Sequence, residues 1–178
     1  MPQLLTLNLA AIALVLVACD QKQASAPSKA PTATSPAAIP SEAFLAVAPA
    51  DAKPVKDVKA VAKSGEKVTV VGRIGMGDEP FVKDRAVFTI VDLGVKYCGE
   101  ETKDSCHTPW DYCCEPSDVL AANSATIQFI NGNGQPLRTE LNGVHGLKPL
   151  TIVSVVGTVA EGTGNSLVIN ADSVYVKP

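Results

Sequence analysis

Two stretches of the sequence decide the fold: EKVTVVGRI at residues 66–74 and VSVVGTV at residues 153–159. Both are rich in Val, Ile and Thr, the β-branched residues that fit the pleated surface of a sheet. Each stretch carries a glycine directly after a pair of valines, at Gly72 and at Gly157. A glycine inside a strand marks a bend or a close approach of another backbone. The two stretches therefore predict long strands that bend in mid-course, as strands do in a sheet that curls and closes.

Further runs of the same texture lie before, between and after these two. The six predicted strands are residues 68–74, 85–93, 125–130, 136–141, 150–160 and 166–176. Glycine-rich turn signals separate several of them, and Asn-Gly pairs between apolar runs favour tight hairpins. No crossover of helical length demands a parallel sheet. The pattern predicts an all-β domain, either a small antiparallel barrel of five to six strands or a small β-sandwich.

The repeated Val-x-Gly-x pattern, followed by a strand that ends the chain, resembles the OB-fold barrels. The resemblance covers residues 66–178 and implies an OB-like barrel in which Gly72 and Gly157 mark the bends. A long cysteine-rich loop would then be an insertion between the second and third strands. Residues 54–63 have helical spacing, with a proline near the first turn and a glycine just beyond the end, so a short N-terminal helix is predicted.

The N-terminus predicts the compartment. Residues 4–18 are almost entirely apolar, shorter than the run of about 20 residues that a membrane-spanning helix needs but of the right length for a signal peptide. The run ends in LVAC at residues 16–19, which resembles the lipobox of bacterial lipoproteins, although no Lys or Arg precedes it. The resemblance implies that residues 1–18 are a signal peptide and that Cys19 is acylated. The protein would then be anchored to membrane lipid in the cell envelope, facing the periplasm or the cell exterior.

Residues 19–50 follow this cysteine and are dominated by Ala, Pro, Ser and Thr. Such a segment buries too little apolar area to offset the entropy of ordering it, so it is predicted to be a disordered tether. Within it, residues 41–47 are more apolar and are candidates for docking on the domain. Residues 51–178 are the predicted folded domain, consisting of the short helix and the barrel.

The charge distribution argues against nucleic acid as a partner. Residues 64–178 carry nine basic and fourteen acidic side chains, and the whole chain has only eight aromatic residues. Proteins that hold nucleic acid use a basic surface, and those that bind single strands add stacking rings. The predicted partners are instead membrane lipid, through Cys19, and an envelope protein or a small ligand.

A single loop holds the remaining chemistry of the chain. It contains Cys98, Cys106, Cys113 and Cys114, together with His107 and three aromatic residues. Its last part, CHTPWDYCC, resembles a group of lipoproteins from planctomycete-type bacteria. That resemblance implies an architecture and no particular reaction.

The loop aromatics Trp110 and Tyr112 stand two residues apart, which would place them on one side of an extended segment. They are interpreted as a small hydrophobic core of the loop, with a stacking platform for a ligand as the alternative. The chain carries no recognisable set of nucleophile, base and acid, so catalysis is not expected and no cofactor is predicted.

Three hypotheses for the cysteines stay open. In the first, a non-catalytic binding or scaffold module is stapled by two disulfides, with Cys113 and Cys114 pairing outward to Cys98 and Cys106, because disulfides persist outside the cytosol. In the second, the four thiolates bind Zn²⁺ or Cu⁺, with His107 as a spare ligand, although the spacing lacks a C-x₂-C pair. In the third, the adjacent Cys113 and Cys114 form a thiol redox switch, which acidic neighbours would disfavour.

Overall fold

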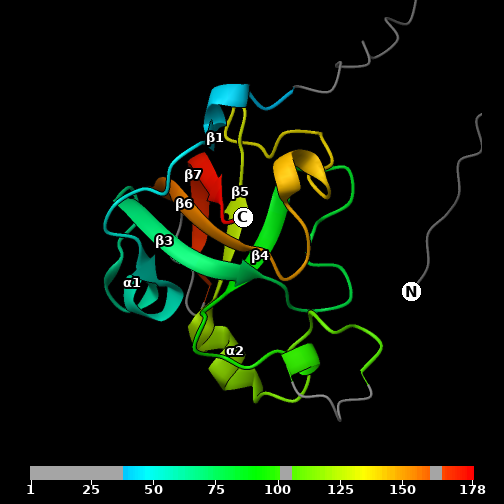
Figure 1. The fold of residues 1–178 in the computed structure, drawn as a ribbon. Coiled ribbons are helices and arrows are strands. Elements are labelled where there is room, and N and C mark those ends of the chain that lie inside the picture. The colour runs from blue at the N-terminus through cyan, green and yellow to red at the C-terminus, as the bar shows by residue number, and fades with distance from the viewer. Residues whose placement is uncertain (1–37, 101–105, 161–165) are drawn as a thin grey trace, which may run out of the picture. The chain divides into compact units, whose positions relative to one another are not determined.

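The computed structural model describes residues 38–100, 106–160 and 166–178 (Figure 1). The predicted signal peptide, Cys19 and most of the predicted tether lie outside the described residues. The strands are β1 (Phe44–Leu45), β2 (Lys53–Pro54), β3 (Lys67–Ile74), β4 (Val87–Val91), β5 (Ser124–Gln128), β6 (Ile152–Val159) and β7 (Val168–Val176). The helices are α1 (Val55–Val61) and α2 (Ser117–Asn123), and the 3₁₀ turns are η1 (Ser41–Ala43), η2 (Cys98–Glu100) and η3 (Val144–Gly146).

Five of these strands close into a barrel, as the sequence predicts. β3 pairs antiparallel with β4 and with β6, β4 pairs antiparallel with β5, and β6 pairs antiparallel with β7. A parallel pairing of β5 with β7 completes the ring. The barrel is therefore not wholly antiparallel, because the chain reverses direction twice between β5 and β7 and both strands run the same way. The strand order is compatible with the predicted OB-like barrel.

The predicted strands agree with the structure except at residues 136–141. Residues 136–141 do not form a strand, and Pro136 makes only an isolated bridge to Ile130. A proline has no N–H to offer a ladder, so it interrupts pairing at the start of this segment. The two-residue strands β1 and β2 were not predicted. Helix α2 was not predicted either, although Pro116 before it and Asp118 in its first turn are ordinary signals of a helix start.

The glycines of the two opening stretches lie close to the backbone of a neighbouring strand. A Cβ atom placed on Gly72 would lie 2.9 Å from the carbonyl oxygen of Val91, and one placed on Gly157 would lie 2.4 Å from that of Asn170. The register between β6 and β7 also shifts between Val156 and Gly157. Both positions therefore need a residue without a side chain, because a neighbouring strand approaches them closely.

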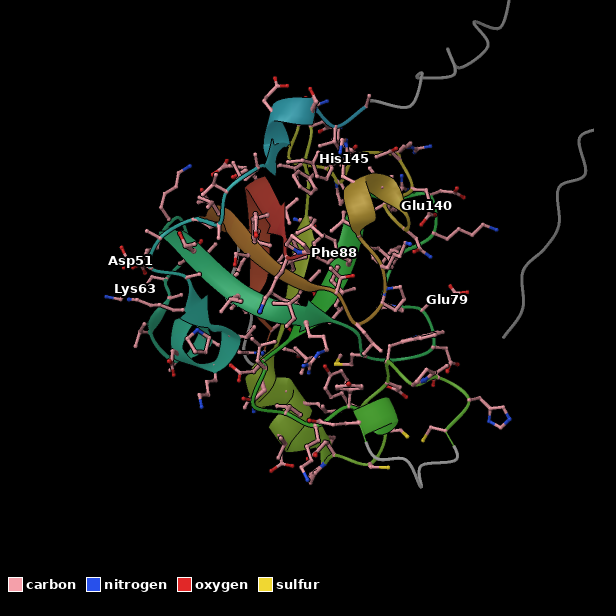
Figure 2. The ribbon with its side chains drawn as sticks, viewed as in Figure 1. Asp51, Lys63, Glu79, Phe88, Glu140 and His145 are labelled. Carbon is pink, nitrogen blue, oxygen red and sulfur yellow. The ribbon has the colours of Figure 1, made fainter. Side chains whose placement is uncertain are left out.

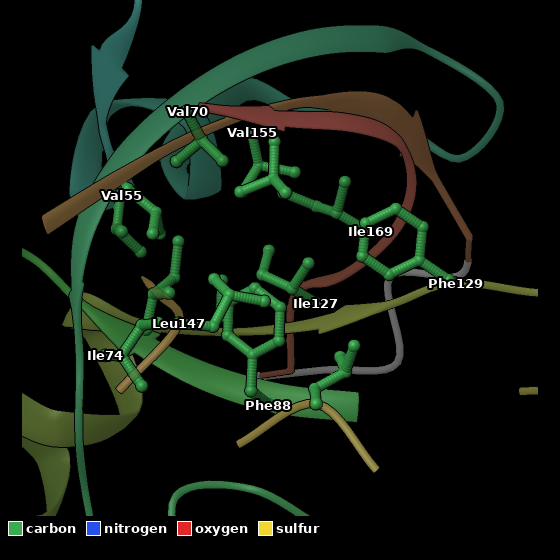
Figure 3. Close-up of a cluster of buried hydrophobic side chains, with 14 of the residues drawn as sticks. Val55, Val70, Ile74, Phe88, Ile127, Phe129, Leu147, Val155 and Ile169 are labelled. Atoms are coloured by element: carbon green, nitrogen blue, oxygen red, sulfur yellow. The ribbon is translucent and has the colours of Figure 1, made fainter. Parts of the chain in front are cut away.

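The main hydrophobic core fills the barrel (Figure 3). It draws on α1 and on all five barrel strands, each of which contributes a fully buried side chain. These are Val55 from α1, Val70 from β3, Phe88 from β4, Ile127 from β5, Val155 from β6 and Ile169 from β7. Helix α1 places Val55 and Val58 in this core. Packing against the barrel therefore stabilises the helix, which is too short to be stable in isolation.

The end of the predicted tether belongs to the folded domain. Ala43 is buried in the core, and β1 pairs parallel with β7, with Phe44 opposite Val174. The ring of Phe44 stacks on His145, with ring centroids 4.0 Å apart. The domain thus begins before residue 51, and the apolar part of the tether docks on the barrel. Within the described part of the chain, no helix has the length and apolar character needed to cross a membrane.

The buried carboxylate of Asp92 joins the end of β4 to helix α1. Its two oxygens accept hydrogen bonds from the N–H of Lys56 in the first turn of α1, at 3.1 Å, and from the N–H of Gly94, at 2.9 Å. We expect Asp92→Ala to lower the free energy of unfolding by about 2–3 kcal/mol, because two donors lose a charged acceptor. Urea unfolding followed by circular dichroism measures this change.

The exposed carboxylate of Asp172 supplies the control for that variant. It pairs with Lys67 at 2.6 Å, and both side chains are at least half exposed. Surface ion pairs contribute less than about 1 kcal/mol, so Asp172→Ala should change stability far less than Asp92→Ala does. Equal effects of the two substitutions would contradict the role assigned to Asp92.

Candidate metal centre

The four cysteines of the loop converge. The sulfur atoms of Cys98, Cys106, Cys113 and Cys114 all lie within 4.8 Å of one another. The sulfur of Cys113 lies 3.2 Å from that of Cys98 and 3.1 Å from that of Cys106. In Figure 2, yellow sulfur atoms lie beside the short green turn η2, which belongs to the loop.

The cluster has a buried side and an exposed side. Cys98 is only 4% exposed, whereas Cys106 is half-buried and Cys113 and Cys114 are exposed. The cluster therefore lies at the surface of the loop, with one buried cysteine and two exposed ones. His107 is exposed and is not part of the group of converging sulfurs.

Backbone hydrogen bonds bring the two ends of the loop together. The N–H of Cys98 donates to the carbonyl of Asp111, at 2.7 Å, and the N–H of Gly99 donates to that of Pro109, at 2.9 Å. A Cβ atom on Gly99 would lie only 2.7 Å from the Cβ of Pro109. These contacts place η2 against the segment that leads into Cys113, so residues distant in sequence share one site.

A second set of bonds fixes the loop to the chain that follows β3. The N–H of Met76 donates to the carbonyl of Trp110, at 3.1 Å. One carboxylate oxygen of Asp111 accepts from the N–H of Gly77 and from that of Tyr112, both at 2.7 Å. The carboxylate of Asp111, two residues before Cys113, therefore stabilises the conformation of the loop.

Tyr112 is the centre of a small second core. It is fully buried and packs with Val91 and Val95, as the interpretation of a loop core predicts. Burial raises the pKa of its hydroxyl, and the nearby guanidinium of Arg73 partly offsets this shift. The same guanidinium lies over the ring of Tyr97, 4.5 Å from its centroid.

Trp110 does not share the environment of Tyr112. The N–H of Asp111 donates to the carbonyl of Thr108, at 2.9 Å, which closes a turn where the sequence suggested an extended segment. Trp110 is consequently half-buried, and its indole N–H donates to the carbonyl of Asp78 at 3.1 Å. Trp110 also lines an open surface cavity of about 540 Å³. The two aromatics thus lie in different surroundings, and only Tyr112 belongs to the loop core.

The neighbouring thiols shift the pKa of Cys113. A hydrogen bond with Cys106 lowers the pKa of the Cys113 thiol, but hydrogen bonds with Cys98 and Cys114, together with desolvation, raise that pKa above its ordinary value overall. Acidic neighbours, which the sequence suggested would disfavour a thiol redox switch, are not among the causes of this pKa shift.

The distances within the cluster can be compared with two kinds of chemistry. A disulfide bond is about 2.05 Å long, and the pairs at 3.1 and 3.2 Å are not bonded to each other. Zinc–sulfur bonds of about 2.3 Å place the corners of a tetrahedron about 3.8 Å apart. The sulfur separations, from 3.1 Å up to 4.8 Å, bracket that value.

The sequence named all four cysteines as possible metal ligands, but the adjacent pair Cys113 and Cys114 counted against a single site. Consecutive side chains of an extended segment point to opposite sides. Both sulfurs nevertheless face the same group, next to a turn in which the N–H of Glu115 donates to the carbonyl of Tyr112 at 2.9 Å. Only the fold of the loop reveals this convergence.

Comparisons with protein-family models, curated proteins and solved structures found no match to this chain.

Proposed function

We propose that this domain binds one thiophilic metal ion through the sulfurs of Cys98, Cys106, Cys113 and Cys114. The observation that carries the proposal is the convergence of all four sulfurs within 4.8 Å. Four thiolates in a tetrahedral arrangement favour Zn²⁺, and soft sulfur ligands also suit Cu⁺. The function follows from the loop, while the barrel serves as its rigid support.

The proposal includes the place where the ion is bound. The lipobox at residues 16–19 and the tether after it imply that the domain is carried on the cell envelope by acylated Cys19. A metal-binding domain in that position meets ions outside the cytosol. Its role is binding, without a reaction of its own.

Metal content tests the proposal directly. The protein is purified reduced, incubated with a slight excess of Zn²⁺ or, anaerobically, of Cu⁺, and passed through a desalting column before elemental analysis. We expect one ion per chain, because the four sulfurs form a single group. Binding should weaken as the pH falls from about 8 to about 6, since protons compete for the thiolates.

The variant His107→Ala is the matched control. His107 is exposed and lies beside Cys106 but outside the group of sulfurs, so its loss should leave both stoichiometry and affinity unchanged. Weaker binding by this variant would make the imidazole a ligand. Wild-type protein that retains neither ion in stoichiometric amount would refute the proposed function.

A stapled scaffold is the second candidate, favoured by one observation. Cys113 lies within 3.2 Å of two other sulfurs, so a modest movement would allow disulfide bonds. Mass spectrometry of protein isolated from the envelope under alkylating conditions distinguishes the two functions. Four alkylated loop cysteines exclude the bridges, and two intact bridges support the scaffold.

A further inference from the structure

We propose that the metal ion is an exchangeable cargo, which enters and leaves over the outward edge formed by Cys113 and Cys114 and is passed to an acceptor that presents a thiolate. This inference rests on the proposed function. It specifies the side from which the ion is reached and the chemical class of the partner.

The first support is the uneven burial of the ligands. Cys98 is 4% exposed, whereas Cys113 and Cys114 are both exposed. Four thiolates complete the coordination of the ion, so an acceptor can take it only by replacing one of them, and an exposed ligand is the one that it can reach. An ion held by these sulfurs would be shielded on the Cys98 side and accessible on the other.

The second support is that the frame of the loop does not depend on the ion. Hydrogen bonds from Cys98 to Asp111, from Gly99 to Pro109 and from Met76 to Trp110 fix it at three separate points. Small zinc domains use the free energy of metal binding to fold. Here the barrel has its own core, so the ion can depart without unfolding the domain.

The third support is the position of Cys113 between its neighbours. Its sulfur lies 3.2 Å from that of Cys98 and 3.1 Å from that of Cys106, the two less exposed members of the group. Cys114 is the other exposed member. Because Cys113 contacts the two inner sulfurs, the bond from the metal to Cys114 is the one expected to open first.

The exchange step is a ligand substitution without oxidation. The incoming thiol gives its proton to solvent, and its sulfur donates an electron pair to form a new bond with the metal. The bond between the metal and Cys114 breaks, the electron pair stays on the sulfur of Cys114, and this sulfur takes a proton from solvent. Repetition at the remaining sulfurs passes the ion to an acceptor with several thiolates.

Alkylation of the loaded protein tests which bonds open. The full chain, loaded with one equivalent of Zn²⁺, is treated with iodoacetamide, and modification at each cysteine is followed by mass spectrometry. Metal-bound thiolates react slowly unless they dissociate, so the order of modification reports the order of opening. We expect Cys114 to be modified about tenfold faster than Cys98. Loss of a single contact at a metal site changes metal affinity by a factor of about this size or more. The same treatment of metal-free protein gives the intrinsic reactivity of each thiol, by which the rates are corrected.

A second measurement tests the acceptor. Dithiothreitol at increasing concentration is mixed with the zinc-loaded protein, and a coloured zinc chelator reports the ion that is removed. Attack by an external thiolate predicts a rate that rises in proportion to the dithiothreitol concentration. Circular dichroism of the product should show the barrel intact.

The outcomes separate this inference from the proposed function. Zinc that is absent from the loaded protein, or that slows no alkylation, refutes the function. Zinc that protects all four cysteines equally, or that leaves at a rate independent of the thiol, overturns the exchange mechanism while the binding function stands. Loss of the barrel on metal removal would likewise make the ion structural rather than a cargo.

Discussion

Gly157→Ala is expected to lower the free energy of unfolding by about 3–5 kcal/mol, because overpacking against backbone cannot be relieved by moving a side chain. The new Cβ atom would lie 2.4 Å from the carbonyl oxygen of Asn170 and 2.7 Å from the Cγ2 of Ile169. That contact forms part of the ladder between β6 and β7, where the register shifts. Separation of the two strands would open the barrel, so urea unfolding should show a markedly lower midpoint.

Gly132 provides the matched control for this substitution. A Cβ atom placed on it meets nothing within 4 Å, and its backbone is not in the left-handed region. Gly132→Ala should be neutral or stabilise slightly, by about 0.4–1 kcal/mol, because alanine restricts the unfolded chain. A stability of Gly157→Ala equal to that of Gly132→Ala would show that β6 and β7 do not approach as closely as the barrel requires.

Cys98→Ser is expected to weaken zinc binding at least about a hundredfold, since even changes behind a metal ligand cost 10–100-fold in affinity. Cys98 is the buried member of the group, and a serine hydroxyl is a poor replacement for a thiolate. Its position faces the protein, so water has little access to complete the coordination of the ion. Competition with a chelator of known affinity measures the change.

Cys114→Ser makes the same chemical change at an exposed ligand. Water can occupy the open position there, as it does beside three protein ligands in catalytic zinc sites, so we expect a loss of only about tenfold. Circular dichroism of both metal-free variants checks that the barrel is intact, and Cys98→Ala repeats the test with an apolar side chain. Equal losses for Cys98→Ser and Cys114→Ser would contradict a site with an inner and an outer side.

The barrel could be predicted because its signals are local. β3 and β6 are visible as runs of β-branched residues, and Gly72 and Gly157 stand where the strands come together. Residues 136–141 misled the prediction because their apolar content comes from core side chains on an irregular segment. Leu141 is fully buried there without belonging to a strand.

The sequence by itself determined the small β-barrel, the docking segment before it and the single loop that holds the cysteines of the domain. These features follow from composition and short-range periodicity, which are written along the chain. Only the tertiary structure decided that the four sulfurs meet, that Cys98 is buried and that Cys113 and Cys114 are exposed. The physical reason is that hydrogen bonds from η2 to residues 109–111 fold the loop back on itself, and such pairings between separate segments leave no local pattern.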